Sequence, residues 1–157
     1  MSEEKINYLE EGNKFFEENK IEEAINSYQN FLIEKPESEE AYFNIGKCYL
    51  KQKDYKKALE NIEKSLEINK INYIYYLNKG VCLFNLKKYK EAVESYNKGI
   101  FLNQEDENLY LNKGVSLNHL KKYKEAIECF NEGIKINPND ASLYNNKGVS
   151  YFFFQKI

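Results

Sequence analysis

Glycine recurs every 34 residues along this chain, at Gly12, Gly46, Gly80, Gly114 and Gly148. Alanine keeps the same period, twelve residues after each of the first four glycines, at Ala24, Ala58, Ala92 and Ala126. A tyrosine lies four residues before every glycine, at Tyr8, Tyr42, Tyr76, Tyr110 and Tyr144. A fixed period of this kind is typical of a structural unit that stacks on copies of itself, and a catalytic motif has no need of it.

Within each unit, apolar residues recur at steps of three and four, which is the spacing of amphipathic helices. Two helices of about 13 residues fit each unit. Short turns such as Lys53-Asp54 join the two helices, and the only prolines, Pro36 and Pro138, lie in the links that follow a second helix. Because a helix must stop near proline, these links separate one helix pair from the next. The sequence therefore predicts an all-α fold of antiparallel helix pairs.

These positions resemble the tetratricopeptide repeat (TPR) family, whose pattern sets a large aromatic residue, Gly, an aromatic, Ala, an aromatic and often Pro at given places. The first unit carries the pattern as Tyr8, Gly12, Phe15, Ala24, Tyr28 and Pro36. Tyrosine replaces the family's usual tryptophan, and Phe31 stands where a small residue is expected late in the second helix. The resemblance covers almost the whole chain without a slip in spacing.

The resemblance implies a right-handed superhelical solenoid in which the first helix of each pair lines the concave face. It places repeats at 5–38, 39–72, 73–106 and 107–140 and a first helix alone at 141–157, all within one domain spanning 1–157. A solenoid of this kind offers an extended groove to a ligand. The RNA-binding pentatricopeptide family fits less well, because its repeats run slightly longer, lack the paired Gly and Ala, and tend to be basic.

An asparagine column runs along the first helices, two residues before each glycine. Its members are Asn44, Asn78, Asn112 and Asn146, and Glu10 takes this place in the first unit. A carboxamide both donates and accepts hydrogen bonds, so a row of them suits the N–H and C=O groups of a peptide main chain. The alternative is that these asparagines bond neighbouring helices to one another.

Apolar residues flank this column on the same face. They are Leu77, Val81, Leu111, Val115 and Val149, with His119 further along the first helix of the fourth unit. Apolar residues on a groove suit a partner with an apolar stretch, although they could equally complete the core. The two most similar units differ where Phe84-Asn85 becomes Asn118-His119, and we expect such differences to select the ligand.

We therefore expect a non-enzymatic scaffold that binds an extended peptide or protein segment in the groove. One alternative is a structural or assembly module of a larger multi-repeat protein, and another is a regulatory domain of an enzyme whose catalytic part lies outside this chain. The carboxylate clamp, with which some family members hold acidic chaperone tails, is missing because Leu9, Ile74 and Asn78 occupy its charged places.

Composition argues against several other functions. A net charge of −2 without any arginine disfavours nucleic-acid binding. No apolar run approaches the roughly 20 residues that span a bilayer, and no signal peptide is visible, so we expect a cytoplasmic protein without membrane insertion. With one histidine, no phosphate-binding glycine loop and no metal-type cysteine spacing, we expect no catalysis, metal or cofactor, and we expect Cys48, Cys82 and Cys129 to be reduced and buried.

The sequence stops at "YFFFQKI", within a fifth unit that has no second helix. Four aromatic residues there should lack cover, namely Tyr151, Phe152, Phe153 and Phe154. Because solenoids usually end in a polar capping repeat, we expect either that the chain is part of a longer array, which we favour, or that this end associates with a second copy.

Overall fold

The computed structural model describes residues 7–156. Residues 1–6 and 157 lie outside this range, and with them the first two residues of the predicted repeat 5–38 and the last of 141–157. The described residues form nine α-helices: α1 (Tyr8–Glu17), α2 (Ile21–Glu34), α3 (Glu39–Lys51), α4 (Tyr55–Ile68), α5 (Tyr73–Asn85), α6 (Tyr89–Leu102), α7 (Glu107–His119), α8 (Tyr123–Ile136) and α9 (Ala141–Phe154).

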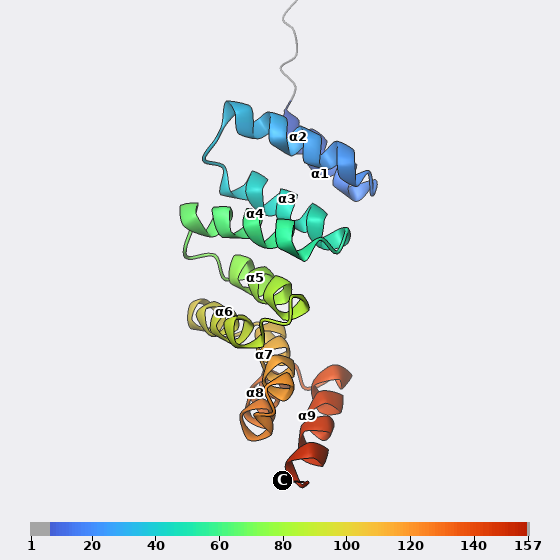
Figure 1. Cartoon of the computed structure of the whole chain (residues 1–157), viewed down its shortest axis with the longest axis vertical. Coiled ribbons are helices and arrows are strands. Elements are labelled where there is room, and N and C mark those ends of the chain that lie inside the picture. The colour runs from blue at the N-terminus through green and yellow to red at the C-terminus, as the bar shows by residue number, and fades with distance from the viewer. Residues whose placement is uncertain (1–6, 157) are drawn as a thin grey trace, which may run out of the picture. The chain divides into compact units, whose positions relative to one another are not determined.

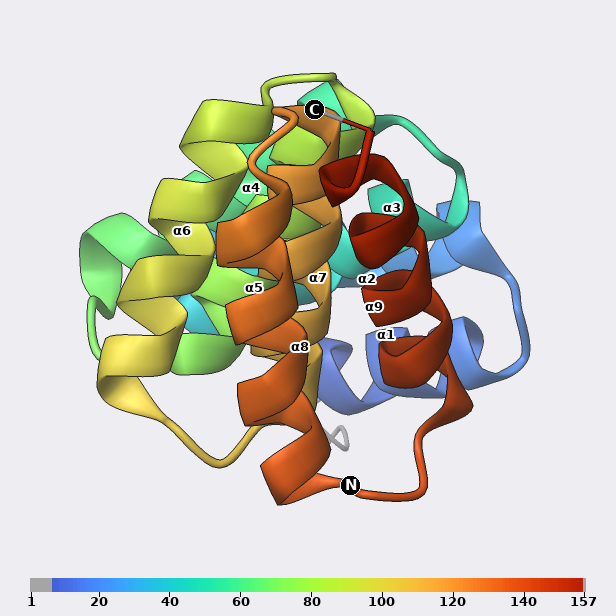
Figure 2. The ribbon, with the colours of Figure 1, turned by 90° about the horizontal axis from the view of Figure 1, so that it is seen from below.

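The helices pack as antiparallel pairs, which confirms the predicted all-α fold (Figure 1). The pairs are α1 with α2, α3 with α4, α5 with α6, and α7 with α8. The chain forms two compact units, residues 1–70 and residues 71–157, which we call unit 1 and unit 2. In unit 2, α7 contacts α5, α6, α8 and α9, and α9 packs beside α8 (Figure 2).

The turn inside each pair has one residue in the left-handed conformation. These residues are Asn19, Lys53, Lys87 and Lys121, with φ between 59° and 61°. In the first turn, the N–H of Lys20 donates to the carbonyl of Phe15 at 2.8 Å and the N–H of Asn19 donates to that of Phe16 at 3.1 Å. This Schellman geometry satisfies the last carbonyls of α1 and reverses the chain directly into α2.

Four of the recurring glycines lie against a large side chain of the second helix in their own pair. A methyl group on Gly80 would lie 2.3 Å from Cε1 of Tyr96, and one on Gly114 would lie 2.5 Å from Cε1 of Phe130. The same contact pairs Gly12 with Tyr28 and Gly46 with Ile62. The two helices of each pair therefore approach closely at the glycine, and the side chain that lies on the glycine comes four positions after the recurring alanine.

A second set of glycines, late in the second helices, receives a leucine from the next first helix. The pairs are Gly99 with Leu109 and Gly133 with Leu143. At the equivalent places unit 1 has Phe31 and Ala41, and both are buried. The departure of Phe31 from the family pattern therefore has a steric reason, because a large residue on either helix is matched by a small residue at the corresponding place on the other.

Gly148 provides an internal control for this packing, because no atom lies within 4 Å of the place its Cβ would take. We expect Gly148→Ala to raise the free energy of unfolding by up to about 1 kcal/mol, since alanine favours helix. Gly80→Ala should lower it by up to about 2 kcal/mol, because overpacking against Tyr96 outweighs that gain. Urea unfolding followed by circular dichroism measures both, and equal stabilisation by the two variants would contradict the close contact at Gly80.

Buried titratable groups contribute to packing. Cys48, Cys82 and Cys129 are buried thiols, and burial raises the pKa of Cys48 to about 11. Burial also raises the pKa of the phenols of Tyr28 and Tyr96 well above the ordinary 10.0. The thiol of Cys48 and these two phenols therefore stay neutral at physiological pH.

Because the buried phenols have raised pKa values, we expect the folded protein to lose stability in alkali. The unfolded chain ionises a phenol near pH 10, whereas folded Tyr96 resists ionisation, so its contribution is present below pH 10 and falls as pH rises above that value. We expect the urea midpoint to fall between pH 9 and pH 11, and less steeply in Tyr96→Phe. Exposed Tyr144→Phe is the control, and an identical slope in both variants would exclude Tyr96 as the cause.

Candidate functional site

Three members of the asparagine column lie half-buried on the first helices of unit 2, at Asn78, Asn112 and Asn146. The Nδ2 of Asn78 donates to the carbonyl of Ile74 at 2.8 Å, and that of Asn146 donates to the carbonyl of Ser142 at 2.9 Å. These bonds hold the carboxamides of Asn78 and Asn146 on their own helices. They leave the oxygen and one N–H of each carboxamide for another group.

Asn44, in unit 1, has different surroundings. Its side chain is 4% exposed, and its Nδ2 donates to Oδ1 of Asn13 at 3.2 Å. The hydroxyl of Tyr28 donates to the same oxygen at 2.8 Å. Asn44 therefore bonds α3 to the α1–α2 pair, as in the alternative interpretation of the column.

The apolar residues of this face are partly used by the core. Leu77, Val81, Leu111 and Val115 are half-buried. Leu111 and Val115 pack against a cluster that includes Leu117, Phe130 and Leu143. Val149, in contrast, is 48% exposed. The face thus covers the core along α7 and offers open apolar surface on α9.

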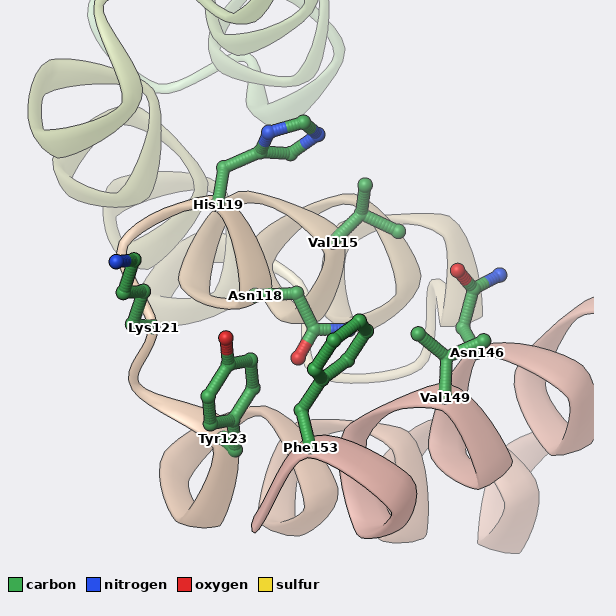
Figure 3. Close-up of a pocket in the computed structure, with 8 residues that line it drawn as sticks. All are labelled: Val115, Asn118, His119, Lys121, Tyr123, Asn146, Val149 and Phe153. Atoms are coloured by element: carbon green, nitrogen blue, oxygen red, sulfur yellow. The ribbon is translucent and has the colours of Figure 1, made fainter. Parts of the chain in front are cut away.

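A pocket of about 380 Å³ opens between α7 and α9, at the start of α8 (Figure 3). Its lining residues are Val115, Asn118, His119, Lys121, Tyr123, Asn146, Val149 and Phe153. Four of them belong to the predicted site, namely Val115, His119, Asn146 and Val149. The lining is mainly apolar, with two carboxamides and Lys121 as the fixed charge, so the pocket suits an apolar side chain beside a hydrogen-bonding group.

Four side chains of this lining lie outside the predicted site, namely Asn118, Lys121, Tyr123 and Phe153. Asn118 accepts a hydrogen bond at Oδ1 from the Oγ of Ser150, at 2.8 Å, which ties α7 to α9. Phe153 stacks on Tyr123 with ring centroids 5.6 Å apart, and Figure 3 shows it beside Asn118. Asn118 belongs to one of the dipeptides that are expected to select the ligand, and the same change of residue type from repeat to repeat is the signal for Phe153.

His119 takes part in an aromatic cluster at the edge of the pocket. Its ring stacks on Tyr89 at 4.5 Å between centroids and meets the edge of Phe84 at 5.2 Å. Figure 3 shows the imidazole turned away from Phe153. Phe84 and His119 come from the two dipeptides at which the nearly identical copies differ, so those two differences meet in space.

A metal site and a membrane-spanning helix were both sought in the described part of the chain. Within residues 7–156, no group of three or more His, Cys, Asp or Glu side chains could hold a metal ion. No helix of that range has the length and apolar character to cross a membrane.

Comparison with known families finds two matches in the sequence. Residues 17–99, just over half of the chain, match the family described as anaphase-promoting complex, cyclosome, subunit 3. Residues 108–140 match the tetratricopeptide repeat family.

Solved structures with a similar fold include MamA, which is 22% identical, with a TM-score of 0.90 over 94% of this chain and 81% of that chain. YrrB, described as a TPR protein with an unusual peptide-binding site, is 25% identical, with a TM-score of 0.85 over 96% and 77%. The first TPR of Spaghetti (RPAP3), bound to the HSP90 peptide SRMEEVD, is 23% identical, with a TM-score of 0.71 over 73% and 90%. For MamA and Spaghetti, this level of identity shows the fold alone.

Proposed function

The chain belongs to the tetratricopeptide repeat family, and we propose that it is a non-enzymatic scaffold that binds an extended peptide on one face of unit 2. We call this surface the groove face. It consists of Leu77, Asn78, Val81, Leu111, Asn112, Val115, Asn146 and Val149, on α5, α7 and α9.

The observation that carries the proposal is the pocket next to Asn146. An extended peptide has N–H and C=O groups along its length and side chains that alternate in direction. The carboxamides of Asn112 and Asn146 would hold main chain, while one apolar side chain enters the pocket between Val115 and Val149. Asn44 is left out of the proposal, because its carboxamide is buried against Asn13.

The comparisons support peptide binding as a class. YrrB is described as having a peptide-binding site, and Spaghetti was solved with the acidic peptide SRMEEVD. The present chain has Leu9, Ile74 and Asn78 where a carboxylate clamp needs charge. Its ligand is therefore proposed to be anchored by an apolar residue instead of an acidic C-terminus.

A peptide selected on the chain from a displayed random library provides the probe. We expect the double variant Asn78→Ala, Asn112→Ala to bind that peptide with an affinity lower by about five- to hundredfold, since two hydrogen bonds contribute roughly 1–3 kcal/mol. The control is Asn97→Ala with Asn131→Ala, which removes two asparagines of α6 and α8 at the same 34-residue separation. Isothermal titration calorimetry measures the affinity of both double variants for the peptide. If the Asn78→Ala, Asn112→Ala variant is folded and binds with unchanged affinity, the groove face does not bind the peptide.

A further inference from the structure

Two lysine-rich turns lie in unit 2, one between α5 and α6 and the other between α7 and α8. Both have the sequence Leu-Lys-Lys-Tyr-Lys-Glu-Ala, at 86–92 and at 120–126. Each turn therefore carries three lysines beside a single glutamate, and all six lysine side chains are exposed. We call them the lysine edge, which consists of Lys87, Lys88, Lys90, Lys121, Lys122 and Lys124.

Ring contacts join the two turns. Tyr89 of the first turn stacks on His119, the last residue of α7, with centroids 4.5 Å apart. Phe84 makes edge contacts with both rings, at 5.2 Å from His119 and 5.4 Å from Tyr89. Lys121 follows His119 by two residues, on the turn that leads to α8 (Figure 3). The lysines of both turns therefore flank one aromatic cluster.

The first lysine of the edge in each turn has an unfavourable backbone conformation. Lys87 and Lys121 are left-handed, with φ of 60° and 61°, and glycine or asparagine adopts this conformation at lower cost. The turn between α1 and α2 has Asn19 at the equivalent place. Lysine is thus present in unit 2 where a neutral residue of the same chain would suit the backbone better.

The other lysines of the edge also lie where a helix prefers different residues. Lys88 and Lys122 are the N-caps of α6 and α8 and make no side-chain cap hydrogen bond, whereas Asp54 caps α4 with its side chain. Lys90 and Lys124 lie in the first turns of these helices, where the macrodipole disfavours a cation. Departures from local preference of this kind are typical of functional surfaces.

The positive charge of the edge is largely unneutralised. Among residues 7–156, Lys122 is the one member of the edge that has an ion pair, with its Nζ 3.0 Å from the carboxylate of Glu125. Both side chains of this pair are about half exposed, at 52% and 54%. Solvent screens such a pair, so the edge attracts a further anionic group.

We propose that the lysine edge is a second binding surface, which takes an acidic segment of a partner protein rich in Asp and Glu. Carboxylates complement the six ammonium groups in charge. The edge adjoins the pocket at Lys121, but it is separate from the groove face, which contains no lysine.

Two other anionic partners fit less well. Nucleic acid is usually held by a strongly basic domain with arginine, whereas this chain has a net charge of −2 and no arginine. A membrane surface needs exposed apolar side chains among the basic ones, whereas Phe84 and Tyr89 are half-buried in their own cluster.

Fluorescein-labelled octaglutamate is the probe, and fluorescence anisotropy with the intact chain at low ionic strength measures its binding. We expect saturable binding that weakens as salt is added, because the contacts join exposed charges. The variant Lys87→Asn, Lys88→Asp introduces the residue types of Asn19 and Asp54. It should bind the probe at least tenfold more weakly, while its urea midpoint is at least as high as that of the original chain, because both changes suit the backbone.

The control is Lys64→Asn, Lys98→Asp, which makes the same change in net charge at exposed places on α4 and α6. We expect it to bind octaglutamate within about twofold of the original chain, because exposed charges more than a Debye length away are largely screened. Neither Lys87 nor Lys88 lines the pocket, so the library-selected peptide should bind their variant as before. Failure here is therefore distinguishable from failure of the proposed function.

Four results would overturn the proposal. Two of them are a lack of saturable binding and an equal loss of affinity in the variant and the control. The third is tighter binding of single-stranded DNA or phosphatidylserine vesicles than of octaglutamate, which would assign the edge to another class of partner. The fourth is self-association at low salt that the Lys87→Asn, Lys88→Asp variant abolishes, which would assign the edge to a second copy.

Discussion

Replacement of Phe130 by alanine is expected to lower the free energy of unfolding by about 3–5 kcal/mol, the usual range for a buried phenylalanine. Phe130 is 0% exposed, lies on Gly114, and belongs to the core cluster shared by α7, α8 and α9. Its removal leaves a cavity that the rigid glycine contact cannot close. Each repeat is stabilised by its neighbours, so the effect should extend beyond this pair.

Urea unfolding followed by circular dichroism measures this loss. The matched control is Phe152→Ala, because Phe152 is 54% exposed, and we expect its effect to stay within about 0.5 kcal/mol. Two variants of equal stability would contradict the assignment of Phe130 to the core.

Leu143→Ala is expected to have the second largest effect, about 2–5 kcal/mol. Leu143 is 0% exposed, and its Cδ2 lies against Gly133 of α8. Because α9 contacts α7 and α8, this leucine holds one wall of the pocket in place. In the Leu143→Ala variant, we expect α9 to unfold locally before the rest of the chain. Amide hydrogen exchange in α9 should then be at least tenfold faster than in α5.

A second substitution tests the mechanism of that release. Gly133→Phe combined with Leu143→Ala recreates the Phe31 and Ala41 arrangement of unit 1. We expect the double variant to recover part of the stability that each single variant loses, which is a coupling between contacting positions. Strict additivity would show that these two positions are not complementary in volume. Asn145→Ala, at an exposed place on α9, controls for a general effect on this helix.

The helix pairs could be predicted from the sequence because their determinants are local and periodic. Gly80 and Ala92 recur at fixed spacing, and the polar turn between them is short. The periodicity alone does not assign the residue that faces each glycine. Alanine also keeps the period, and only the packed helices show that the side chain on Gly80 is that of Tyr96, four residues further on.

The asparagine column shows where sequence reasoning ends. Asn44 and Asn112 hold the same place in their repeats, but the surroundings of each side chain depend on the residues of the preceding repeat. In unit 1 the preceding helix supplies Asn13, which accepts a hydrogen bond from Asn44. The equivalent residue before Asn112 is Val81, which has no polar atom to offer. A repeated residue can therefore be structural in one repeat and available to a ligand in another.

In the proposed function, the asparagines of unit 2 hold the main chain of the peptide. The most direct test is a titration of ¹⁵N-labelled protein with the library-selected peptide, monitored on the side-chain NH₂ signals. We predict that the signals of Asn78, Asn112 and Asn146 shift, whereas that of buried Asn44 stays in place. Shifts confined to the second helices, with these three carboxamides unchanged, would contradict the account.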